Sequence, residues 1–117
     1  MSYEISRVGD VEVVRITESK LSYAALSELQ LEIDRRIEAG ARKMVVNLAP
    51  VAFVDSFAVG IIAAATRRIE GAGGELRLCG VGERVRMSLT ITRLDKRVPI
   101  YPDEASALQS FAQSDRG

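Results

Sequence analysis

Short β-type segments alternate with segments of helical periodicity along this chain, and this order constrains the fold more than any other feature. The segments Tyr3–Val8 and Val11–Ile16 alternate polar and apolar residues and are separated by Gly9-Asp10, a combination typical of a β-hairpin. Further β-type segments follow, at 44–48, 75–79 and 98–101. A hairpin followed by strands that alternate with helices predicts an α/β fold, with a mixed, mostly parallel sheet of about five strands and about four helices.

The helical segments carry recognisable start and stop signals. Ser22 stands at a position where its hydroxyl can cap the first helix, and Gly40 ends it. A second helix is expected from Asp55 to about Glu70 and a third over Glu83–Ile91. Pro102-Asp103 is expected to cap a fourth helix. The segments Met44–Leu48 and Val98–Tyr101 are expected at different places in the sheet, the first central because it is nearly all apolar and the second at an edge because of Pro99.

The length of 117 residues fits one domain, which we place at 1–112, followed by a frayed tail at 113–117. Sixteen basic and sixteen acidic residues give no net charge, which argues against a nucleic-acid partner. The most apolar stretch, 44–65, is interrupted by polar residues and a proline, so no membrane span is expected.

Two residue types are nearly or completely missing, and this limits the possible chemistry. The chain has no histidine, which excludes Ser-His-Asp catalysis and histidine-ligated zinc. Its single cysteine, Cys79, excludes an internal disulfide and fits a reducing, cytoplasmic setting. We therefore expect a protein that is not an enzyme and that needs neither a metal nor another cofactor.

The informative stretch is Asp55-Ser56 at the start of the second helix. If Asp55 is the N-cap, its carboxylate accepts a hydrogen bond from the backbone N–H of Phe57 or Ala58, and the Ser56 hydroxyl points outward. Taken alone, an Asp-Ser pair before a helix is most often only a cap.

The same helix is expected to show an unusual solvent-facing side. Helical spacing predicts that one side faces the sheet, through Ala58, Ile62, Ala65 and Ile69. The other side is expected to bind a protein partner, through an exposed Phe57 with Gly60, Ala64, Arg67 and Arg68. Phosphate on Ser56 would add about −1.5 to −2 charges beside this side, which the helix N-terminus tolerates and a docked partner would not.

The stretch Val45–Gly60, followed by Gly73–Leu78 and Val85–Leu94, resembles the STAS domain (sulfate transporter and anti-sigma factor antagonist). The resemblance extends to Tyr101–Leu108 and so covers nearly the whole chain. In bacterial anti-sigma factor antagonists of this family, the serine after the aspartate is phosphorylated by the anti-sigma factor, a serine kinase that uses ATP. The unphosphorylated form binds that kinase and frees the sigma factor, and a metal-dependent serine phosphatase removes the phosphate.

The resemblance implies that Ser56 is the phosphate acceptor, Asp55 its acidic neighbour and Gly60 the second glycine of the family pattern. That pattern reads Asp-Ser-Ser/Thr-Gly-Leu-Gly, whereas residues 55–60 read Asp-Ser-Phe-Ala-Val-Gly. An Asp-Ser-Phe version also occurs among STAS proteins, including the small scaffold subunit of the stressosome. Ser19–Ser22 also replaces the Gly and Asp that usually precede the first helix.

These observations leave one alternative open within the family: a scaffold or transporter-accessory STAS protein that does not switch at Ser56. A homodimer or a larger assembly is also left open. Outside the family, the chain lacks the carboxylates that a receiver domain holds around Mg²⁺. It also lacks the Gly-x-Ser-x-Gly flanks and the histidine base of a serine hydrolase, which leaves only a lysine, with no motif around it, as a base. The glycines at 71–74 and 80–82 match no phosphate-binding loop. A basic cluster late in the chain is expected to be a solvated face or to complement an acidic partner; it comprises Arg84, Arg86, Arg93, Lys96 and Arg97.

Overall fold

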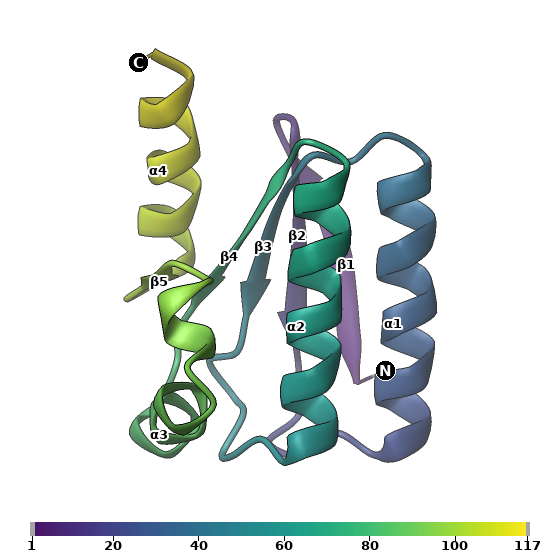
Figure 1. The fold of residues 1–117 in the computed structure, drawn as a ribbon, viewed down its shortest axis with the longest axis vertical. Coiled ribbons are helices and arrows are strands. Elements are labelled where there is room, and N and C mark those ends of the chain that lie inside the picture. Colours follow the sequence, from purple (N-terminus) through teal and green to yellow (C-terminus); the bar gives the residue numbers. More distant parts are fainter. Residues whose placement is uncertain (1, 117) are drawn as a thin grey trace.

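A computed structural model describes residues 2–116 and shows one five-stranded sheet with helices on both faces (Figure 1). The strands lie in the order β1-β2-β3-β4-β5. Their bounds are β1 Tyr3–Val8, β2 Val11–Ile16, β3 Lys43–Asn47, β4 Glu75–Cys79 and β5 Ile100–Tyr101. The helices are α1 Tyr23–Glu38, α2 Ser56–Gly71, α3 Glu83–Ile91 and α4 Glu104–Arg116, with a short 3₁₀ turn at Leu94–Lys96. The predicted α/β class is confirmed.

The predicted opening hairpin is present. Strands β1 and β2 pair antiparallel from Tyr3 opposite Ile16 to Val8 opposite Val11, and Gly9 at the turn has a φ of 62°. A positive φ of this kind suits glycine, which has no Cβ to clash. The remaining neighbours pair in parallel, which completes the mixed, mostly parallel sheet.

The central strands are buried on both faces, because helices cover both. Val14 and Val46 face the core beneath α1 and α2, whereas Val13 and Val45 face α4. All four are no more than 5% exposed. A fully buried side chain of this size stabilises a fold by about 1.5–3 kcal/mol, so the two apolar layers together hold the sheet between its helices.

Strand β5 is shorter than predicted. Only Ile100–Tyr101 pair with β4, at the sheet edge, because Pro99 lacks the N–H that would extend the ladder. Helix α3 precedes this strand and buries Val85 and Leu89 in the larger core, at the lower end of the molecule in Figure 1.

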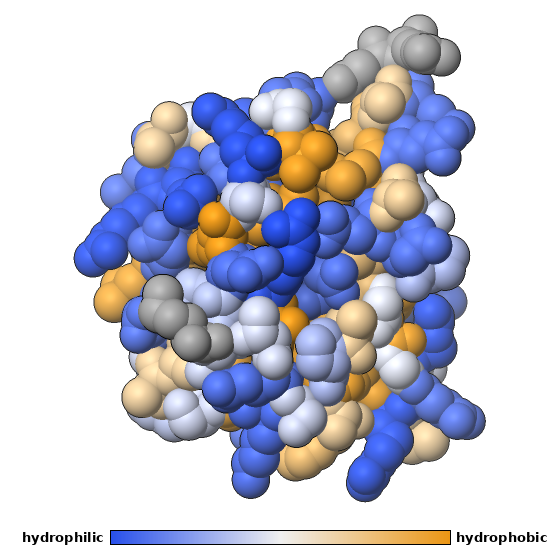
Figure 2. All heavy atoms as spheres, turned by 180° about the vertical axis from the view of Figure 1, so that it is seen from behind, coloured by the Kyte–Doolittle hydropathy of each residue, from blue (hydrophilic) through white to orange (hydrophobic). Residues whose placement is uncertain are grey.

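Helix α4 lies on the face opposite α1 and α2. Its residues Ala107 and Phe111 are buried against the sheet, and Phe111 also lies under the Arg77 guanidinium at 3.9 Å. The predicted cap is present, since the Asp103 carboxylate accepts a hydrogen bond from the Ser106 N–H at 2.8 Å. Seen from behind in Figure 2, this side carries hydrophilic side chains with smaller apolar areas between them. The predicted frayed tail at 113–117 stays a prediction: α4 extends to Arg116, and Gly117, like Met1, lies outside the described residues.

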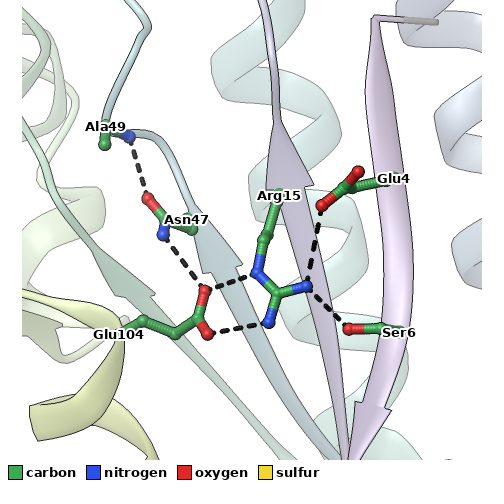
Figure 3. Close-up of polar contacts among 6 residues, drawn as sticks. All are labelled: Glu4, Ser6, Arg15, Asn47, Ala49 and Glu104. Atoms are coloured by element: carbon green, nitrogen blue, oxygen red, sulfur yellow. Dashed lines mark hydrogen bonds and ion pairs between the residues drawn. The ribbon is translucent and has the colours of Figure 1, made fainter.

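A polar network fixes the start of α4 to three strands (Figure 3). The Arg15 guanidinium donates to both Glu104 carboxylate oxygens, at 2.8 and 2.9 Å, and to the Ser6 hydroxyl at 2.7 Å. The Asn47 amide donates to Glu104 at 3.2 Å and accepts from the Ala49 N–H at 3.0 Å. One carboxylate on α4 thus joins strands β2 and β3 and the loop that leaves β3.

Candidate functional site

The loop between β3 and α2 places Asp55 and Ser56 at one end of the molecule. It is anchored at several points: the Leu48 N–H donates to the Cys79 carbonyl at 3.0 Å, and the Ala52 N–H donates to the Ser19 carbonyl at 2.9 Å. The loop therefore has a defined path over the segment that precedes α1. The N-terminal ends of α1 and α2 lie side by side at the lower end of Figure 1, with α3 near them.

Asp55 is the N-cap that the sequence predicts. Its backbone is extended, with φ −89° and ψ 178°, and its Oδ1 accepts a hydrogen bond from the Ala58 N–H at 2.8 Å. Its carbonyl accepts from the Val59 N–H at 3.0 Å, the first bond of the helix ladder. The carboxylate thereby satisfies a backbone donor that the helix itself cannot pair.

Ser56 occupies the first position of α2 and is exposed. Within residues 2–116, no hydrogen bond to its hydroxyl is observed. The side chain is therefore available to solvent and to another protein. Its surroundings are the cap carboxylate of Asp55 and the positive end of the helix dipole.

Phe57 differs from the prediction of an exposed anchor, because it is only partly exposed. Its ring stacks on Tyr23, with ring centroids 4.4 Å apart and an interplanar angle of 23°. It also packs against Leu26, Ala58 and Ile61, the cluster that joins α1 to α2. The large exposed aromatic beside Ser56 is instead Tyr23, at 71% exposure, which the sequence reasoning missed. No local pattern marks Tyr23, because its importance depends on how α1 packs against α2.

The buried side of α2 is also wider than predicted. Ala58, Ala65 and Ile69 are buried as expected, whereas Ile62 is only half-buried. Val59, Ile61 and Thr66 are buried in addition. The cause is that α2 packs against α1 as well as against the sheet, so two sides of the helix are buried rather than one.

The remaining predicted partner residues lie along the outer side of α2. Gly60 is exposed, and a Cβ built on it would meet no other atom within 4 Å. Ala64 is half-buried, and Arg67 and Arg68 are exposed. Arg68 forms an ion pair with Asp34 of α1 at 3.1 Å, so its guanidinium is already engaged within the chain. Ser56, Gly60, Arg67 and Arg68 are thus accessible, as a contact surface requires.

Cys79 is fully buried, and burial raises the pKa of its thiol to about 11, so it stays protonated at neutral pH. Within residues 2–116, no group of three or more Asp, Glu and Cys side chains is arranged to hold a metal ion. No helix in this part of the chain is long and apolar enough to cross a membrane.

Comparisons with known proteins agree with this geometry. The family model described as STAS domain matches residues 2–107. The anti-sigma F factor antagonist of Paenibacillus polymyxa is 28% identical over 109 residues, which are 92% of each chain.

Among solved structures, a variant of RsbS from Moorella thermoacetica superposes with a TM-score of 0.88 at 22% identity and covers all of both chains. The phosphorylated form of SpoIIAA from Bacillus superposes with a TM-score of 0.77 at 21% identity, over 93% of this chain and 98% of that one. The helix that Asp55 caps, with Ser56 exposed in its first turn, is therefore part of a fold that this chain shares with anti-sigma factor antagonists. The chain belongs to the STAS domain family.

Proposed function

We propose that this protein is an anti-sigma factor antagonist that binds a serine-kinase anti-sigma factor while Ser56 is unmodified and is released when Ser56 is phosphorylated. The observation that carries the proposal is the exposed Ser56 hydroxyl in the first turn of α2, beside a cap made by Asp55. A metal-dependent serine phosphatase would restore the binding form. The curated relative from Paenibacillus polymyxa, an anti-sigma F factor antagonist, supports the assignment to this class.

The position of Ser56 explains how phosphorylation would act on binding and not on the fold. A phosphoserine carries about −1.5 to −2 charges at neutral pH. At the start of α2 this charge faces unpaired backbone N–H groups and the positive end of the helix dipole, which both stabilise it. Because Ser56 is exposed, no side chain of the described core must move to make room.

A docked partner would respond differently. An interface fitted to the neutral hydroxyl would have to bury a dianion next to the Asp55 carboxylate, and burying unpaired charge costs several kcal/mol. SpoIIAA has been solved in its unphosphorylated and phosphorylated forms, and both superpose on this chain, with TM-scores of 0.83 and 0.77. This supports a switch in which the fold stays the same and the surface changes.

We further propose that the partner contacts the outer side of α2, through Phe57, Gly60, Ala64, Arg67 and Arg68. Gly60 lets a partner backbone approach closely, since there is no side chain above it. Arg67 is exposed, whereas Arg68 would first have to share or leave its ion pair with Asp34. Contacts by Arg67 are thus expected to contribute more to affinity than contacts by Arg68.

One observation favours the second candidate, a STAS scaffold that does not switch. The Phe57 ring stacks on Tyr23 directly beside the acceptor, where the family pattern has a small residue, so a kinase has less room around Ser56. A chain of the stressosome, named a signal integration and transduction hub, also superposes with a TM-score of 0.79 at 21% identity. In this case Ser56 would accept phosphate slowly or not at all.

The test combines partner capture with variants of Ser56. Partners captured by the unphosphorylated protein are identified by mass spectrometry, and the affinity of the captured kinase for each variant is measured by calorimetry. Ser56→Asp is expected to keep the thermal unfolding midpoint within a few degrees and to weaken binding at least about tenfold. Ser56→Ala is expected to bind normally and to take up no phosphate from ATP.

Gln109→Glu is the matched control, because it adds one negative charge at an exposed position of α4, on the opposite face of the sheet. It is expected to leave binding unchanged. Equal binding by Ser56→Asp and the parent chain would refute the switch. Phosphate uptake that persists in Ser56→Ala would place the acceptor at another residue.

A further inference from the structure

Exposed apolar side chains are concentrated near α3. Among residues 2–113, six large apolar side chains are exposed: Val8, Tyr23, Leu31, Phe53, Met87 and Ile91. Two of them, Met87 at 59% and Ile91 at 75%, are one turn apart on α3, and Phe53 lies in the neighbouring loop. Half of the exposed apolar set therefore belongs to one region that the proposed switch does not use.

Contacts within the chain link α3 to the loop that carries Phe53. The Arg84 guanidinium lies 6.0 Å from the centre of the Phe53 ring, and the Ser88 hydroxyl lies 3.4 Å from the Val54 carbonyl. Val85 and Leu89 point to the opposite side of α3, where both are fully buried in the core. Because the core fixes that side, α3 must present Arg84, Met87 and Ile91 outward. We call Phe53, Arg84, Met87 and Ile91 the α3 surface.

The segment that contains α3 has an excess of basic residues. Residues 83–97 contain five basic and two acidic residues, although the whole chain is neutral. The Asp95 carboxylate accepts a hydrogen bond from the Thr90 hydroxyl at 3.3 Å, so one of the two acids is engaged locally. Of the basic side chains, Arg97 is paired with Glu70. The others include Arg84, which is exposed.

We propose that the α3 surface is a second docking site, which binds an acidic, amphipathic helical segment of a partner protein. Met87, Ile91 and Phe53 supply the apolar contact, and basic residues around them attract glutamates and aspartates of the partner. Isolated exposed apolar residues are ordinary, but exposed apolar residues grouped on a segment with a basic excess are typical of an interaction surface. The test uses the unphosphorylated chain and a peptide in place of the kinase, so its failure is distinguishable from a failure of the switch.

The probe is a short helical peptide that is apolar on one side and carries glutamates on the other. The same peptide with lysines in place of the glutamates tests the sign of the charge. Both are titrated into the full-length ¹⁵N-labelled protein, and amide chemical shifts are followed by NMR. We expect the acidic peptide to shift the signals of α3 and of Phe53 and Val54, with an affinity that falls as salt is added.

Met87→Glu is expected to weaken binding of the acidic peptide at least about tenfold, because it places in the site a charge of the same sign as the glutamates of the peptide. Leu31→Glu is the matched control: Leu31 has the same 59% exposure but lies on α1, away from the α3 surface. It is expected to leave the affinity unchanged. Thermal unfolding of both variants checks that each is folded.

Several outcomes would overturn the proposal. These are no shift at α3 with the acidic peptide, equal binding of the lysine peptide, or an equal loss of affinity in Leu31→Glu. Light scattering distinguishes a different occupant: a dimer that becomes monomeric in Met87→Glu would assign the surface to a second copy of this chain. Binding to anionic phospholipid vesicles that Met87→Glu abolishes, without peptide binding, would assign it to a membrane.

Discussion

The contact between Arg15 and Glu104 gives a quantitative test of how α4 is held on the sheet. The two residues are 89 positions apart, and two hydrogen bonds of 2.8 and 2.9 Å join them in a bidentate pair. Their side chains are 30% and 23% exposed, so water screens the pair only partly. A charge-assisted hydrogen bond in such a setting contributes about 1.5–3 kcal/mol, whereas a fully exposed ion pair contributes about 0.2–1 kcal/mol. We expect a coupling energy between the two limits, about 1–2 kcal/mol.

The measurement is a double-mutant cycle of Arg15→Ala, Glu104→Ala and the double variant, with urea unfolding at neutral pH. The cycle cancels the separate benefit of an acidic residue in the first turn of α4, because that benefit does not depend on Arg15. The control cycle uses Arg97 and Glu70, which are 2.9 Å apart but 56% and 41% exposed. We expect its coupling energy to be below about 0.5 kcal/mol.

The same pair predicts how stability depends on pH. The hydrogen bonds from Arg15 hold the pKa of Glu104 below its ordinary value. The unfolded chain therefore takes up this proton at a higher pH than the folded protein does. The stabilisation is complete above the ordinary glutamate pKa of about 4.3 and is lost as the pH falls through the lowered pKa. A coupling energy no larger than that of the control cycle, or one that grows as the solution is acidified, would refute this account of the contact.

Three further predictions concern the capped helix, two glycines and the buried thiol. Asp55→Ala removes the cap of α2 and is expected to lower the free energy of unfolding by about 1 kcal/mol in urea titrations, with a smaller loss for Asp55→Asn, which keeps an acceptor oxygen. Gly74→Ala places a Cβ against the Arg42 carbonyl and is expected to cost about 1–3 kcal/mol, whereas Gly60→Ala, with open space above it, is expected to stabilise the chain by up to about 1 kcal/mol; a thermal unfolding midpoint that moves the same way in both would contradict this. Cys79 is expected to react with a thiol-specific dye only after urea unfolds the protein, because burial and the raised pKa leave no accessible thiolate, and rapid labelling of the native protein at pH 8 would show that the site opens.

The local elements of this protein follow from local sequence patterns. The hairpin register at Gly9-Asp10, the Ser22 cap of α1 and the Asp55 cap of α2 all depend on residues within a few positions of one another. The physics that decides them is local: a backbone N–H without a helical partner, or a turn that needs a positive φ. The exposure of Ser56 follows from the same cap, since the first helical position is free once Asp55 takes the role of N-cap. The order of strands and helices then determined the mixed sheet, because parallel neighbours need a helical crossover between them.

The tertiary structure alone decided which distant side chains meet. The spacing on α2 indicated an exposed Phe57, but the packing of α1 against α2 places Tyr23 on its ring and makes that tyrosine the exposed aromatic beside Ser56. Likewise, Pro102-Asp103 predicted where α4 begins but not the pairing of Glu104 with Arg15 across the sheet. Helical periodicity shows on which side of a helix its own apolar residues lie. The neighbour that covers each side, and therefore the surface that stays free for a partner, depends on contacts between segments far apart in the chain.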